Sequence, residues 1–299
     1  MPRAQSLPEP FTVTPFRVRD AIAADVPAAR LRRRDLESPV HGVRARAGSK
    51  PTLLESIAVV LRPDQHFSHT TAARIWGAPL DSRLGDDPVH VTSSSAVVMR
   101  RTRVIGHRAA SPDVREHAGF RVSAPADAWF ECAGLVSVVE LVVIGDHMVG
   151  RSGLATIDDL SASIRVGARG VRAAREALAR IRVGSESRME SVLRLAVLDA
   201  GFPEPELNVD VFDGAGVFLG RVDMAWPELK VALEYDGDHH RERDAFQRDQ
   251  RRRNGFEVNG WLVIHATARD AGRPAVMFER LRQAFVQREY ETRRDRVGE

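Results

Sequence analysis

Apolar residues recur at helical spacing in several parts of the chain, and this predicts amphipathic helices because residues three or four apart share one helix face. Gly77 and Gly201 each follow such a segment, and glycine is typical just beyond a helix end. Helices are predicted over residues 51–61, 70–76, 126–149 and 188–200. Two further helices are expected within residues 151–184.

Short segments of alternating apolar and polar residues predict strands, because neighbouring side chains point to opposite faces. Residues 89–94 and 102–108 have this pattern and predict a small sheet in the N-terminal half. In the C-terminal third we expect three strands, around Val211, from 217 to 226 and from 230 to 235. The last is almost continuously apolar, as in a central strand covered on both faces.

The C-terminal third continues with a charged helix that ends near Asn254, a core strand at 261–264 and a closing helix through Phe285. A helix, a three-stranded meander and a further helix is the core order of a restriction-endonuclease-like domain. We therefore predict an α/β protein whose C-terminal domain is of the PD-(D/E)xK type, with a mixed sheet flanked by helices.

The start of the chain predicts a shortened winged helix-turn-helix. Residues 1–15 are rich in proline and are expected to be disordered. A short helix beginning at Phe16, a second helix opening at Val26 and a strand over 41–46 would follow. The second helix carries four arginines between 30 and 34, and either Arg30 and Arg33 contact DNA phosphates or the basic face is only solvated.

The positive charge is almost entirely arginine, since Lys50 and Lys230 are the only lysines among 44 basic residues. Arginine can donate two hydrogen bonds at once to a phosphate or to the edge of a guanine base. The codon usage of a GC-rich genome would produce the same composition without any such partner. The net charge of +3 does not by itself indicate a nucleic-acid partner.

Composition also sets the expected compartment. Cys132 is the one cysteine, which excludes an internal disulfide, and no run of 18 apolar residues predicts a membrane span. The first residues lack the apolar stretch of a secretion signal. We expect a protein of the reducing cytoplasm, without a membrane partner.

Three carboxylates in the C-terminal third predict a metal site. Glu234 lies within an apolar strand, Asp236 shares its face two residues on, and Asp223 lies on the preceding strand. Carboxylates this close stay ionised together only around a cation, and oxygen ligands suit Mg²⁺ or Mn²⁺. Glu190, on the helix over 188–200, could reach the same cluster.

The C-terminal third resembles the Vsr-like endonucleases, relatives of the very-short-patch-repair nuclease, over about 110 residues. The matching residues are Asp223, Glu234, Asp236, Gly237, His240, Asp249, Arg252, Gly260, Trp261, Val263 and Ile264. The resemblance implies that Glu190, Asp223 and Glu234 bind metal, and that Asp236 and His240 flank them in the active site. Asp236 stands where the wider PD-(D/E)xK pattern has lysine, which shifts water activation to the metal or to His240.

Each candidate has an ordinary structural alternative. Asp223 could pair with Arg221 or Arg252, Asp236 could be a turn residue, His240 could lie on the surface and Glu190 could face solvent. The basic helix after Glu234 could be a solvated face, or its arginines could meet phosphates beside the cluster. The arginines concerned are Arg241, Arg248 and Arg252.

Four histidines in the N-terminal half lack the tight spacing of metal ligands, so we expect structural or surface roles for them. They are His66, His69, His90 and His107.

The N-terminal half resembles actinobacterial proteins similar to AbiEi-type antitoxins, through FSHTTAARIWGAPL, VHVT and the apolar stretch that ends LVVIGDHMV. The resemblance implies a transcription-regulating or toxin-countering role. The predicted domains are residues 1–50, a disordered arm and winged-helix-like segment; 51–150, an α+β domain; 151–184, a helical linker; and 185–299, the nuclease domain.

Two functions stay open at this point. One is a Mg²⁺-dependent DNA endonuclease with an N-terminal DNA-contacting module. The other is a non-catalytic DNA-binding regulator that keeps the nuclease fold as a scaffold. DNA is the expected partner of both, and a homodimer and a toxin or defence-system partner are compatible with either.

Overall fold

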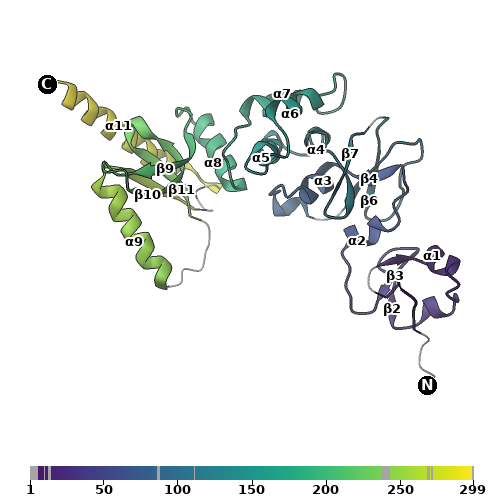
Figure 1. The fold of residues 1–299 in the computed structure, drawn as a ribbon. Coiled ribbons are helices and arrows are strands. Elements are labelled where there is room, and N and C mark those ends of the chain that lie inside the picture. The colour runs from purple at the N-terminus through teal and green to yellow at the C-terminus, as the bar shows by residue number, and fades with distance from the viewer. Residues whose placement is uncertain are drawn as a thin grey trace. The chain divides into compact units, whose positions relative to one another are not determined.

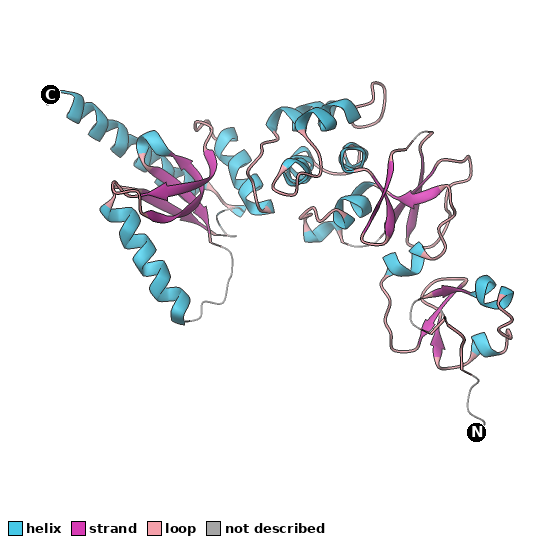
Figure 2. Ribbon diagram, viewed as in Figure 1, coloured by secondary structure: helices cyan, strands magenta, loops and turns pink. Residues whose placement is uncertain are grey.

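The computed structural model describes residues 6–9, 11–12, 15–85, 88–110, 112–236, 243–267, 270 and 272–297 of the chain. Internal packing divides the chain into two compact units, whose elements are labelled in Figure 1 and coloured by type in Figure 2. The N-terminal unit comprises residues 1–76 and 81–131, and the C-terminal unit comprises 77–80 and 132–299. No helix in the described ranges has both the length and the apolar character needed to cross a membrane.

The N-terminal unit begins with a small sheet of strand order β1-β3-β2. Its elements are β1 (Phe16–Arg17), α1 (Val18–Ala23), a 3-10 turn η1 (Arg30–Arg32), β2 (Leu36–Glu37) and β3 (Val43–Arg46). The buried side chains of Phe16, Ala21, Val26 and Leu31 form its core. The strand predicted over 41–46 is confirmed in β3.

The predicted basic helix after Val26 is wrong, because this segment forms only the single turn η1. Arg30 is buried, and its guanidinium donates to both carboxylate oxygens of Asp35 at 3.0 and 2.7 Å. This ion pair joins the turn to the chain entering β2, so Arg30 is not exposed to a phosphate as predicted. Arg33 is exposed.

A five-stranded sheet of order β6-β5-β4-β8-β7 follows in the same unit. The predicted strands are confirmed as β5 (Val89–Ser93) and β6 (Val104–Arg108), whereas three further strands were not predicted. Those strands are β4 (Gln65–Phe67), β7 (Val114–His117) and β8 (Phe120–Ser123). The accompanying helical elements are α2 (Leu53–Ala58), α3 (His69–Ile75), η2 (Ser82–Leu84) and α4 (Pro125–Cys132).

The C-terminal unit starts with three helices, α5 (Val138–Val149), α6 (Ile157–Ser163) and α7 (Val171–Arg180). They belong to the same compact unit as the C-terminal sheet and as helix α8 (Arg188–Asp199), which precedes that sheet in the chain. A fully buried ion pair joins α5 to α8, with Arg194 Nη2 donating to Asp146 Oδ2 at 2.8 Å. The unit boundary therefore lies near residue 131, while the expected division at residue 150 falls inside the C-terminal unit.

The C-terminal sheet has the order β12-β11-β10-β9. Its strands are β9 (Glu206–Phe212), β10 (Phe218–Trp226), β11 (Val231–Tyr235) and β12 (Leu262–Ala266), with a 3-10 turn η3 (Pro227–Leu229) between β10 and β11. Neighbouring strands are antiparallel except β11 and β12, which are parallel. Helix α9 (Arg243–Val258) makes the crossover between these two, and α11 (Ala275–Val297) follows β12.

Both faces of the central strand β11 are covered, as its apolar sequence predicted. Val231 and Leu233 pack in a cluster with residues of α8 and α11, including Leu193 and Leu281. Ala232 packs in a second cluster with Phe256 of α9. Glu234 has the same parity as Ala232 along β11, so its side chain projects to the face that α9 covers.

We expect Arg194→Met to destabilise the protein strongly, because it leaves the Asp146 carboxylate buried without its cation. Burial already raises the pKa of Asp146, and Arg194 opposes that effect. Breaking a buried pair typically costs about 3–5 kcal/mol. The measurement is the free energy of unfolding in urea.

The double variant Arg194→Met/Asp146→Asn should recover part of that loss, since neither charge remains. Arg115→Met removes an exposed ion pair with Asp113 and serves as the control, with an expected change below about 1 kcal/mol. Equal losses for Arg194→Met and Arg115→Met would contradict a structural role for the buried pair.

Candidate functional site

Asp223 and Glu234 lie on adjacent antiparallel strands, each directly beyond the last pair of the ladder, Met224 with Leu233. The side chain of Asp223 reaches β11, where Oδ2 accepts from the backbone N–H of Tyr235, the residue after Glu234. The two predicted ligands therefore come from neighbouring positions on the two strands.

The Asp223 carboxyl is the most perturbed group of this region. Its pKa is raised to about 6, chiefly by burial and also by the nearby carboxylates of Glu190 and Glu234. The backbone N–H of Tyr235, which donates to Asp223 Oδ2 at 2.7 Å, opposes this shift, as does the positive charge of Arg252. Glu190 and Glu234 thus both lie within electrostatic reach of Asp223.

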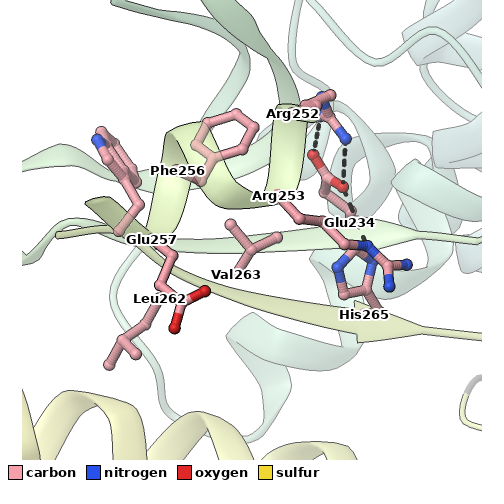
Figure 3. Close-up of a pocket in the computed structure, with 9 residues that line it drawn as sticks. Glu234, Arg252, Arg253, Phe256, Glu257, Leu262, Val263 and His265 are labelled. Carbon is pink, nitrogen blue, oxygen red and sulfur yellow. Dashed lines mark hydrogen bonds and ion pairs between the residues drawn. The ribbon is translucent and has the colours of Figure 1, made fainter. Parts of the chain in front are cut away.

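Glu234 is held by Arg252 of α9 (Figure 3). Arg252 Nη1 donates to Glu234 Oε2 at 3.0 Å, and Nη2 donates to Oε1 and to the carbonyl oxygen of Arg221. The guanidinium carbon also lies 5.0 Å from the centre of the Phe256 ring. Arg252, expected to meet DNA or to pair with Asp223, instead neutralises a buried carboxylate on the neighbouring strand.

Position 220 makes room for this arginine. A Cβ atom built on Gly220 would lie 2.5 Å from Arg252 Nε, closer than such atoms pack. Arg221, beside it on β10, pairs with Asp210 on β9, with Nε donating to Oδ1 at 2.7 Å. The predicted alternative that Arg221 pairs with Asp223 is therefore wrong.

Glu190 lies in the first turn of α8, which Ser187 caps by accepting from the Glu190 N–H. Its side chain is buried rather than solvated: Oε2 accepts from the Glu186 N–H at 2.8 Å and from Asn208 Nδ2 at 3.0 Å. Asn208 has a left-handed backbone, with φ of 50°, within β9. This irregular point in the strand holds Glu190 toward the sheet.

His265 is a site residue that the sequence analysis missed. It lies in β12, where the parallel register pairs it with Glu234. Its Nδ1 atom is 3.3 Å from Asp236 Oδ2 and 3.8 Å from Glu234 Oε2. A titratable residue inside the otherwise apolar strand at 261–266 was the signal that could have identified it.

An open pocket of about 310 Å³ lies beside these groups, between α9 and β12. Figure 3 shows Glu234, Arg252 and His265 at one end of it, and Phe256 and Leu262 together with the carboxylate of Glu257 toward the other. The residues that line it are Glu234, Arg252, Arg253, Phe256, Glu257, Trp261, Leu262, Val263 and His265.

Two predicted site residues, His240 and Arg241, fall outside the described residues, as does Gly237. Arg248 lies in α9, but its side chain is outside the described part of the chain. Their expected roles stay predictions.

The chain is similar to two uncharacterized proteins of Mycobacterium tuberculosis, one from strain CDC 1551 / Oshkosh and one from strain H37Rv. Each is 28% identical over 217 residues, which covers 70% of this chain and 78% of the relative. No family model matches the chain. No solved structure matches it either.

We expect Asp223→Asn to stabilise the metal-free protein at neutral pH, because the wild-type carboxyl ionises less readily in the folded state than in the unfolded one. A folded-state pKa of about 6, above the ordinary aspartate value of 3.8, means a stability penalty that is complete above pH 6. The penalty fades as pH falls from 6 through 3.8, below which the carboxyl is protonated in both states. The variant should gain up to about 3 kcal/mol at pH 8, since the shift spans about two pKa units and each corresponds to about 1.4 kcal/mol.

Thermal unfolding in EDTA at pH 8 and pH 4.5 measures this effect. Asp210→Asn is the matched control on β9, because Arg221 lowers the pKa of Asp210 and removal of that charge should not stabilise the protein. A gain of Asp223→Asn that is equal at both pH values would contradict the assignment.

Proposed function

We propose that the C-terminal unit is a metal-dependent DNA endonuclease that hydrolyses phosphodiester bonds. The observation that carries this proposal is the convergence of Glu190, Asp223 and Glu234 from α8, β10 and β11. The chain order α8-β9-β10-β11-α9-β12, with β12 parallel to β11, supports the restriction-endonuclease-like fold implied by the Vsr-like resemblance.

The chemistry of the donors suits a hard divalent cation, because all three are carboxylates. Among the described residues, the oxygens of these three side chains do not all lie within 4.8 Å of one another, so a bound cation would have to draw them together. Burial is the main cause of the raised pKa of Asp223, and the charges of Glu190 and Glu234 add to it. Glu190, Asp223 and Glu234 would hold Mg²⁺ or Mn²⁺. Such a cation, when bound, polarises a phosphodiester and lowers the pKa of a bound water.

The neighbouring side chains supply the remaining functions. Asp236 and His265 lie beside Glu234, where they can orient a water or accept its proton. Arg252 neutralises Glu234 in the metal-free protein. A cation on Glu234 would release this guanidinium toward a phosphate, which is the contact expected from the sequence.

The same pairing favours a second candidate, a DNA-binding regulator that uses the fold as a scaffold. A bidentate arginine already satisfies Glu234, and Asp236 occupies the position of the usual lysine. In this candidate the ion pair is permanent and the unit binds no catalytic cation. The exposed Arg33 of the N-terminal unit would contact DNA in either case.

Cleavage tests the proposal directly. We expect the untagged protein to cut plasmid DNA or short duplexes in Mg²⁺ or Mn²⁺ but not in EDTA. Asp223→Asn should reduce the rate by at least about 100-fold, since a lost ligand removes several kcal/mol of charge stabilisation. Asp210→Asn, one strand away, should cut normally. Two results would contradict the proposal. One is an Asp223→Asn variant that cleaves at the wild-type rate, and the other is a wild type that is inactive in every divalent metal.

Arg252→Met separates the two candidates by metal affinity. The variant keeps an apolar contact for Phe256 but removes the charge that competes for Glu234, so calorimetry should show Mn²⁺ binding several-fold more tightly. Arg253→Met, at the neighbouring exposed position of α9, should bind Mn²⁺ as the wild type does. The scaffold candidate instead predicts a destabilised Arg252→Met variant without measurable Mn²⁺ affinity.

A further inference from the structure

Three histidines of the N-terminal unit, for which the sequence spacing predicted structural or surface roles, come together in the fold. His69 begins α3, His90 lies in β5 and His107 lies in β6. One ring nitrogen from each lies within 4.8 Å of those of the other two. Ligand spacing along the sequence gave no sign of this cluster, because its members come from three different elements.

The strand register explains the convergence. β5 and β6 are parallel, with His90 paired to Ile105 and Thr92 paired to His107. All four side chains therefore project to one face of the sheet. His90 Nδ1 and His107 Nε2 are 2.9 Å apart, and the rings of His69 and His107 stack with centroids 3.7 Å apart.

His69 is fixed in place at some cost. Its backbone is left-handed, with φ of 53°, a conformation that residues other than glycine rarely adopt. Glu131 Oε2 accepts from the His69 N–H at 3.0 Å, and the same oxygen accepts from Ser123 Oγ at 2.9 Å. Ser68 Oγ lies 2.9 Å from His69 Nδ1. Strained backbone held by such contacts is characteristic of functional positions.

The same region contains buried polar atoms without a partner. Among the described residues, His66 Nε2 and Thr92 Oγ1 are buried and make no hydrogen bond. The β4–β5 register pairs His66 with Thr92, so both lie on the face that carries His90 and His107. Unsatisfied buried groups are rare in proteins, and an absent ion or water is one physical reason for them.

We propose that His69, His90 and His107 bind a divalent transition metal of the Zn²⁺ type, at a site separate from the carboxylate cluster. Imidazole nitrogens suit Zn²⁺ and Co²⁺, whereas Mg²⁺ prefers oxygen ligands. Three protein ligands leave one position for water, as in zinc sites that act on a substrate.

Electrostatics agree with this geometry. Burial lowers the pKa of all three imidazoles, to about 4 for His90. The rings are therefore neutral at pH 7, and neutral imidazole is the form that binds metal. The His90 and His107 nitrogens that now share one hydrogen bond would both turn to the cation.

The proposal is tested with the untagged full-length protein, stripped by chelator and titrated with Zn²⁺ and with Co²⁺. We expect one equivalent of Zn²⁺ to stay bound through gel filtration. Co²⁺ should give the visible absorption of a site with several nitrogen ligands. The Asp223→Asn variant, which disables the proposed carboxylate site, should still give the nitrogen-ligand absorption of Co²⁺, so failure here is distinguishable from failure of the proposed nuclease site.

His107→Gln is the decisive variant, because β6 is an edge strand and its side chain is only partly buried. It should weaken Co²⁺ binding by more than ~10-fold, the lower range seen when support for a metal site is lost. His117→Gln, a histidine of the same unit that stacks on Trp76, is the matched control and should bind normally. Circular dichroism checks that both variants fold.

Three results would overturn the site. They are a wild type that retains neither metal, a folded His107→Gln variant with wild-type affinity, and equal losses in His107→Gln and His117→Gln.

Discussion

A carboxylate buried in a sheet needs a positive charge, and the ion pair between Glu234 and Arg252 meets this need in the C-terminal unit. Several local features depend on the pair. Gly220 leaves room for the guanidinium, Phe256 packs beneath it, and the parallel pairing of β11 with β12 makes α9 the crossover that brings Arg252 over Glu234. Asp223 lies one strand away, and its burial is the main reason for its raised pKa.

The periodicity of apolar residues was sufficient to predict most elements of the C-terminal unit. Its central strand was predicted from an unbroken apolar run, and the two apolar clusters on its faces confirm why that run is needed. Asp223 and Glu234 could be predicted as neighbours because a short turn joins their strands. Arg252 could not be assigned to Glu234, since a partner 18 positions away depends on how the crossover helix lies.

The N-terminal unit was predicted less well, for physical reasons visible in particular residues. The run of arginines after Val26 has a helical appearance, but the buried Arg30–Asp35 pair closes a single turn instead. Strands β4, β7 and β8 have only three or four residues each, too few for an alternating pattern to stand out. The histidine cluster depends on the register of β5 and β6 and on the left-handed backbone of His69. Neither can be predicted from the spacing of the histidines along the sequence.

Asn208 also affects how the sheet meets other chains. It lies in β9, an edge strand, and a regular edge exposes a row of backbone groups to which a strand of another molecule can add. The left-handed backbone of Asn208 interrupts that row at the point where its side chain orients Glu190. A single irregular residue therefore both shapes the carboxylate cluster and protects the sheet against aggregation through its edge.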